Sequence, residues 1–117
     1  MSENLDILDQ QTALQAVSGN KQLADDLLSM FIKELPNYKQ TIKSELQSNN
    51  REQLKQIIHK IHGGLRYLGA PALMAIVSRT DAALFDLSDH ELAEGIEQIY
   101  IELDRVMEAG SYSEAQS

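Results

Sequence analysis

The sequence predicts an all-α fold, an antiparallel up-down-up-down four-helix bundle with a short extra N-terminal helix. Apolar residues recur at spacings of three and four along most of the chain, as they do on one face of a helix. No segment alternates as a strand would, and the short connections favour antiparallel neighbours. The 117 residues suffice for one domain with a single core.

The first half of the chain predicts a short helix, roughly Gln10 to Val17, across one end of the bundle, and then a long helix that begins near Asn20. The apolar stripe of the long helix is formed by Leu27, Phe31, Leu35, Tyr38, Ile42 and Leu46. Pro36 falls inside this stripe. Because proline lacks a backbone donor and crowds the preceding turn, we expect a kink or a break into two helices around Leu35.

The third main segment predicts a helix that begins after Asn50, which forms a capping-box pattern with Gln53. Its stripe is formed by Leu54, Ile57, Ile58, Ile61, Leu65 and Leu68. Gly69 is placed to end this helix as a C-terminal cap residue.

Two further helices are predicted in the second half. Pro71 suits the first turn of one, which closes near Asp86, and Ser88 with Glu91 forms a capping box for the last. Their stripes are formed by Leu73, Ile76, Val77, Thr80 and Leu84, and by Leu92, Ile96, Ile99, Leu103 and Val106. We therefore expect a flexible N-terminus at 1–9, the bundle domain at 10–109 and a disordered polar tail at 110–117.

Composition argues against several classes of protein. The formal net charge of -8 opposes binding to nucleic acids. No apolar run approaches the length of a membrane span, and the N-terminus does not resemble a signal peptide. The absence of cysteine removes disulfides and thiolate metal sites from consideration. We expect a cytoplasmic monomer that binds neither nucleic acid nor membrane.

Positive charge gathers in the third helix of this acidic chain. Between positions 51 and 66 it carries Arg51, Lys55, Lys60 and Arg66, with Glu52 as the only acid. A helical wheel turns His59 well away from the apolar stripe. The same outward sector carries Lys55, His62, Gly63 and Arg66. If a nitrogen of His59 accepts a phosphoryl group, these cations would meet its negative charge.

The neighbours of His59 have separate expected roles. His62 lies nearer the edge of the apolar stripe, so packing or support is at least as good an interpretation as direct chemistry. Gly63 and Gly64 each cost about 1 kcal/mol relative to alanine in a helix. Something other than helix stability should favour them, and the missing side chains would let another protein approach the His59 ring.

The same residues allow other interpretations. A lone exposed histidine or a basic helix face is usually only solvated surface, and His90 is expected to be inert. A metal site at His59 and His62 would need further ligands, yet no Asp or Glu shares the adjacent turns and the cations repel metal ions, so no metal is expected. No phosphate-binding glycine loop is present, so another protein must load a phosphohistidine here.

The segment "HKIHGGLRYLGAPAL" resembles the histidine-containing phosphotransfer (HPt) domain. His59 matches the phosphorylated histidine of that family, Ile61 its apolar position, Gly63 its first glycine and Gly69 its second. The segment "ALQAVSGNKQLADDLLSMFIKELP" also looks like the family's opening helices, so the resemblance covers most of the chain.

The sequence departs from the family pattern in two places. His62 replaces the usual lysine, which resembles the variant in the tail domains of BarA-like hybrid sensor kinases, and Gly64 replaces a small Ser or Ala. Lys55 and Arg66 could supply the fixed positive charge that a lysine would carry. By the resemblance, Asp81 occupies the place of a polar side chain that holds the ring of the phosphorylated histidine.

The resemblance implies a phosphocarrier and not an enzyme. A receiver domain of a hybrid sensor kinase would pass a phosphoryl group to His59, which would pass it to an aspartate of a response regulator. The receivers would bring the Mg²⁺, so this chain would need no cofactor. The alternative left open is a helical adaptor that binds receiver domains without accepting phosphate.

Overall fold

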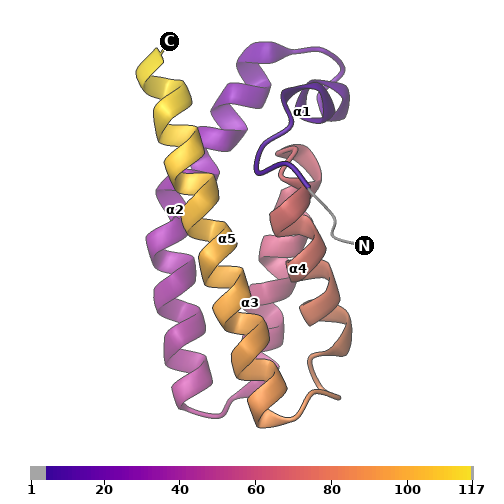
Figure 1. The fold of residues 1–117 in the computed structure, drawn as a ribbon, viewed down its shortest axis with the longest axis vertical. Helices are drawn as coiled ribbons and strands as arrows, with labels where there is room; N and C mark the ends of the chain where they lie inside the picture. The colour runs from indigo at the N-terminus through magenta and orange to yellow at the C-terminus, as the bar shows by residue number, and fades with distance from the viewer. Residues whose placement is uncertain (1–4, 117) are drawn as a thin grey trace.

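The computed structural model describes residues 5–116, with side chains up to residue 110, and the regular secondary structure in this part of the chain is all helical (Figure 1). Its elements are α1 (Gln10–Ala16), α2 (Lys21–Gln47), α3 (Arg51–Gly64), the 3₁₀ turn η1 (Leu65–Tyr67), α4 (Pro71–Ala83) and α5 (Asp89–Gln116). The all-α prediction is confirmed. None of the helices between residues 5 and 116 combines the length and the apolar character needed to cross a membrane.

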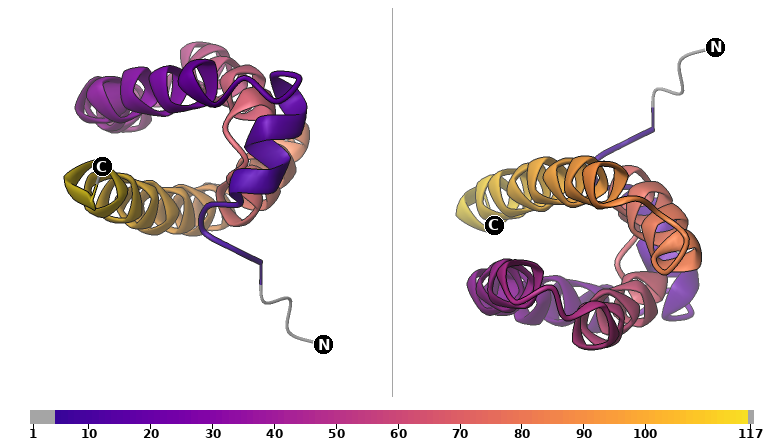
Figure 2. Two further views of the ribbon diagram at one scale, coloured as in Figure 1. Left: turned by 90° about the horizontal axis from the view of Figure 1, so that it is seen from above. Right: turned by 90° about the horizontal axis from the view of Figure 1, so that it is seen from below.

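The four long helices form one antiparallel bundle. Along the chain, α2 and α4 run in one direction and α3 and α5 in the other (Figure 1). Helix α2 packs against α3 and α5, and α4 packs against the same two helices, so the bundle closes on itself. Helix α1 lies across the end where α3 meets α4 (Figure 2). This is the predicted up-down-up-down arrangement with a short extra helix.

The predicted apolar stripes form the core. Every main helix contributes fully buried side chains, among them Leu35 from α2, Ile58 from α3, Leu73 from α4 and Ile99 from α5. The first two stripes also include partly buried residues, such as Leu27 at the edge of the core. The helical spacing of apolar residues therefore predicts the core correctly.

Helix α2 contains Pro36 without a break, so of the two expected outcomes the division into two helices does not occur. Proline removes one backbone hydrogen bond, but Leu35 beside it is fully buried and keeps the helix packed on the core. Figure 1 shows the upper part of α2 inclined relative to its lower part, which agrees with the expected kink.

Backbone hydrogen bonds and helical structure extend into both of the expected end segments. Residues 1–4 of the expected flexible segment lie outside the described residues. Within the rest of that segment, the Asp6 carbonyl accepts a hydrogen bond from the Ala72 N–H, and the Asp9 N–H donates one to the Gly69 carbonyl. At the other end, α5 extends to Gln116, within the segment expected as a polar tail. Gly110 is buried against Ile32 of α2, and a Cβ at this position would collide with Ile32. Close packing of the two helices therefore accompanies a glycine whose intrinsic helix propensity is low.

The predicted caps explain where the site helices begin and end. Asn50 accepts the N–H of Gln53 at 3.1 Å and starts α3. The regular α-helix ends at Gly64, earlier than expected, and continues as η1 before Gly69 turns the chain with a φ of +64°. The turn at Gly69 reverses the chain direction and lays α4 alongside α3, which brings together side chains that are distant in sequence.

Candidate functional site

The side chain of Asp81, on α4, organises the site between α3 and α4. It is only 6% exposed, although it is charged. Its Oδ2 atom lies 2.9 Å from Nδ1 of His59 and 2.9 Å from Nδ1 of His62. One carboxylate oxygen therefore holds both imidazole rings of α3.

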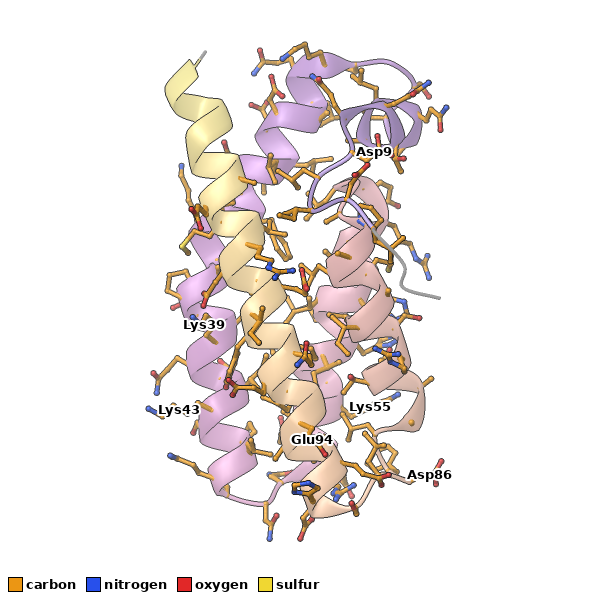
Figure 3. All side chains as sticks on the ribbon, in the orientation of Figure 1. Asp9, Lys39, Lys43, Lys55, Asp86 and Glu94 are labelled. Carbon is orange, nitrogen blue, oxygen red and sulfur yellow. The ribbon has the colours of Figure 1, made fainter. Side chains whose placement is uncertain are left out.

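Lys55 completes the contacts of Asp81. Its Nζ atom lies 2.8 Å from Oδ1 and also donates a hydrogen bond to the backbone carbonyl of Asp81. Figure 3 shows Lys55 beside α4, on the opposite side of the view from Lys39 and Lys43 of α2. Burial raises the pKa of the Asp81 carboxyl, but the contacts with Lys55, His59 and His62 outweigh burial and lower that pKa to about 2. Asp81 is ionised at neutral pH.

The ionised carboxylate fixes the tautomers of both histidines. A carboxylate can only accept hydrogen bonds, so Nδ1 of each ring must carry the proton that it donates to Asp81. In the neutral ring, Nε2 then carries the free lone pair. His59 and His62 are thus each oriented with Nε2 pointing away from the carboxylate.

The two rings differ in exposure, as the helical wheel predicts. The side chain of His59 is 71% exposed and that of His62 is 28% exposed. The rings meet edge to face, with centroids 6.2 Å apart. His59 presents its Nε2 to solvent, whereas His62 is partly covered.

Open space adjoins His59 along α3. Gly63 and Gly64 are exposed, and a Cβ added at either would meet no atom within 4 Å. Gly64 has ordinary helical angles, with φ -67° and ψ -29°. Neither packing nor backbone conformation requires glycine at these two positions.

Arg51 and Arg66, two further cations of the basic segment, do not contact Asp81. Arg66 lies exposed in η1 and, within residues 5–116, makes no hydrogen bond or ion pair. Arg51 makes its contacts away from the site. Its guanidinium donates hydrogen bonds to the carbonyls of Leu84 and Leu87 and forms an ion pair with Asp89. Arg51 therefore joins the start of α3 to the α4–α5 connection.

The helical wheel could not find the central residue of this site. It relates residues within one helix, whereas Asp81 reaches His59 from a neighbouring helix across 22 positions of sequence. Only the family resemblance pointed to Asp81. The structural role of Arg51 was missed altogether, and no local pattern indicates it.

The chain is similar to known proteins over most of its length. The family model described as the Hpt domain matches residues 26–109. The chain is 34% identical over 80 residues to the sensor histidine kinase GacS of Pseudomonas protegens, covering 68% of this chain and 9% of that protein. It is 30% identical over 105 residues to the signal transduction histidine-protein kinase BarA of Escherichia coli K12, covering 89% of this chain and 11% of that protein.

The chain thus spans about a tenth of the length of these relatives. A crystal structure described as the HPT domain from the Hpt sensor hybrid histidine kinase from Shewanella superposes with a TM-score of 0.87 at 25% identity. That match covers 95% of this chain and 96% of the other. Because the family model matches well over half of its length, the chain belongs to the Hpt domain family of histidine phosphotransfer modules.

Proposed function

We propose that this protein is a phosphorelay intermediate that accepts a phosphoryl group on Nε2 of His59 from a receiver-domain aspartate and passes it to an aspartate of a response regulator. The observation that carries this proposal is the hydrogen bond from Nδ1 of His59 to the ionised Asp81. It keeps the lone pair on Nε2 of a ring that is 71% exposed.

The transfer step is a nucleophilic substitution at phosphorus. The Nε2 lone pair attacks the phosphorus atom of the donor's aspartyl phosphate, and a P–N bond forms as the P–O bond to the aspartate breaks. The donor carboxylate leaves with the bonding electron pair. Nδ1 keeps its proton, so the phosphorylated ring is cationic, and Asp81 beside it offsets that charge. Transfer to the second aspartate is the reverse of this step.

The same contacts support both states of the histidine. Asp81 fixes the ring before transfer, which removes the entropic cost of orienting it during the reaction. Lys55 holds Asp81 in place from its other oxygen, and His62 shares the carboxylate. Arg66 has no other partner in the described chain, so it is free to meet the phosphoryl oxygens.

The proposed partners are the receiver domains of a hybrid sensor kinase and of a response regulator. The chain's match to kinases named GacS and BarA supports this choice. The exposed Gly63 and Gly64 leave room for such a partner beside His59. Receivers would supply Mg²⁺, and the cytoplasmic monomer expected from the sequence remains a prediction.

Labelling from a phosphorylated receiver tests the proposal. The chain should acquire label that is labile in acid and stable in alkali, and His59→Gln should abolish it. His62→Ala should slow labelling without abolishing it. His90→Gln is the matched control, because His90 is exposed on α5, where its Nε2 lies 3.1 Å from the carboxylate of Glu94. Its labelling should equal that of the unmodified chain.

Two outcomes would contradict the proposal. Label that survives in His59→Gln would place the phosphoryl group on another residue. A receiver that binds the chain but leaves His59 unlabelled would favour the adaptor function instead.

A further inference from the structure

Three metal-ligating side chains converge at one point of the described structure. His59, His62 and Asp81 each offer a ligand atom, and these atoms all lie within 4.8 Å of one another. The expectation of no metal site depended on the lack of a carboxylate near the two histidines. Asp81 supplies that carboxylate from α4.

We propose that His59, His62 and Asp81 form a reversible Zn²⁺ site that blocks the phosphoacceptor nitrogen when it is loaded. Two imidazoles and one carboxylate, with a fourth position left to water, are a donor set that zinc accepts readily. The part of this proposal that concerns Zn²⁺ binding is independent of the proposed relay function. Only the block on phosphoacceptance depends on it.

The distances suit coordination through Nδ1 of each ring and Oδ2 of Asp81. Both Nδ1 atoms already face Oδ2 at 2.9 Å. Ligand atoms about 2.0–2.2 Å from zinc lie farther apart than that, so each Nδ1 needs to separate from Oδ2 by only a few tenths of an ångström. The His59 ring is exposed and free to make this movement.

Lys55 limits both how Asp81 can coordinate zinc and how tightly the site can bind it. Its ammonium group stays on Oδ1, so Asp81 can ligate only through Oδ2. This nearby positive charge weakens cation binding. A weak site with an exposed ligand is exchangeable, which fits a reversible inhibitor better than a structural ion.

Coordination through Nδ1 would reverse the tautomer of His59. A metal-bound Nδ1 cannot keep its proton, so the neutral ring carries its proton on Nε2 instead, through exchange with water. Nε2 then has no lone pair with which to attack phosphorus. Zinc would therefore stop phosphoacceptance without covering Nε2.

Zinc binding is tested by titrating ZnCl₂ into the full chain in competition with a chromogenic zinc indicator. We expect one Zn²⁺ per chain. His62→Lys keeps a side chain that can donate a hydrogen bond to Asp81 but removes a zinc ligand, and it should weaken binding by at least ~10-fold. His90→Ala should bind as the unmodified chain does, because His90 lies outside the cluster. Equal affinity in His62→Lys, or a loss of binding in His90→Ala, would overturn the site.

Imidazole ¹⁵N spectra of the unmodified chain give a second test that needs no variant. Saturating Zn²⁺ should move both rings from the Nδ1–H to the Nε2–H tautomer. Retention of the Nδ1–H tautomer in both rings would overturn the assignment.

The predicted block on phosphoacceptance is tested by measuring the rate of labelling by a phosphorylated receiver with and without Zn²⁺. Each variant is compared with its own rate in the absence of zinc. Zinc should suppress labelling of the unmodified chain and of His90→Ala, and have at least ~10-fold less effect on His62→Lys. Equal suppression in all three would locate the effect in the receiver and overturn the inhibitory role. Failure of the relay function itself would appear separately, as absence of label without zinc.

Discussion

At the scale of the residue, one buried carboxylate determines what the site can do. Asp81 remains ionised because three donors surround it, and an ionised carboxylate leaves each histidine only one way to place its proton. The nitrogen that carries the free lone pair is therefore determined by a neighbouring residue and not by the histidine itself. At the adjacent Gly63 and Gly64, an added Cβ would meet no atom within 4 Å, and we interpret this open space as room for a partner.

Gly63 provides a test of that interpretation. Gly63→Ala should raise the free energy of unfolding by up to about 1 kcal/mol, because alanine favours the helix and its Cβ meets no atom. Gly63→Phe should also fold, yet slow labelling from a phosphorylated receiver by at least ~10-fold, because the ring would displace the partner. Urea denaturation and labelling rates measure the two effects. A destabilised Gly63→Ala or a fully active Gly63→Phe would show that the glycine has another role.

At the scale of the element, side chains that cap the helices fix where each begins. Ser88 and Glu91 form a complete capping box at the start of α5, with hydrogen bonds of 2.9 and 3.1 Å. The Ser88 backbone N–H that donates to Glu91 is the main cause that lowers the pKa of the Glu91 carboxyl. The ionised form of Glu91 therefore stabilises the folded state.

The capping box predicts a pH dependence of stability. Because the pKa of Glu91 is lower in the folded state, its contribution is complete above the unfolded pKa and disappears as pH falls through the folded pKa. Glu91→Ala should thus be less stable than the unmodified chain at pH 7, and this difference should shrink at pH 3. Asn50→Ala is the control, since it removes the cap of α3 at a cost of about 1 kcal/mol, and the Asn50 amide does not titrate. Urea denaturation at both pH values measures the free energy of unfolding. A difference between Glu91→Ala and the unmodified chain that is the same at pH 7 and pH 3 would contradict this prediction.

At the scale of the whole molecule, the turn at Gly69 joins three parts of the chain. Its carbonyl accepts the N–H of Asp9 at 2.7 Å, which ties the N-terminal segment to the α3–α4 connection. A Cβ at Gly69 would collide with the Asp9 carbonyl and with Ala13 of α1. The backbone there is also left-handed. Glycine is therefore required at Gly69 both by conformation and by space.

A comparison of Gly19 with Gly69 separates the requirement of backbone conformation from that of space. Gly19 also has a positive φ, of 82°, but no atom lies within 4 Å of a Cβ placed there. Gly19→Ala should cost about 1 kcal/mol from backbone strain alone. Gly69→Ala should cost about 2 to 4 kcal/mol, because a steric collision adds to the strain. Equal losses in thermal or urea unfolding would show that α1 moves aside without cost.

The sequence by itself determined the number of main helices, their caps, the core residues and the outward position of His59, because each depends on the local period of a helix. It left open whether Pro36 kinks or breaks its helix, and it gave no sign of the backbone hydrogen bonds that Asp6 and Asp9 make to distant residues. Only the tertiary structure decided which nitrogen of His59 is free and that His59, His62 and Asp81 meet at one point. Those outcomes depend on how α4 packs beside α3, and the periodicity of a single helix carries no information about the register between two.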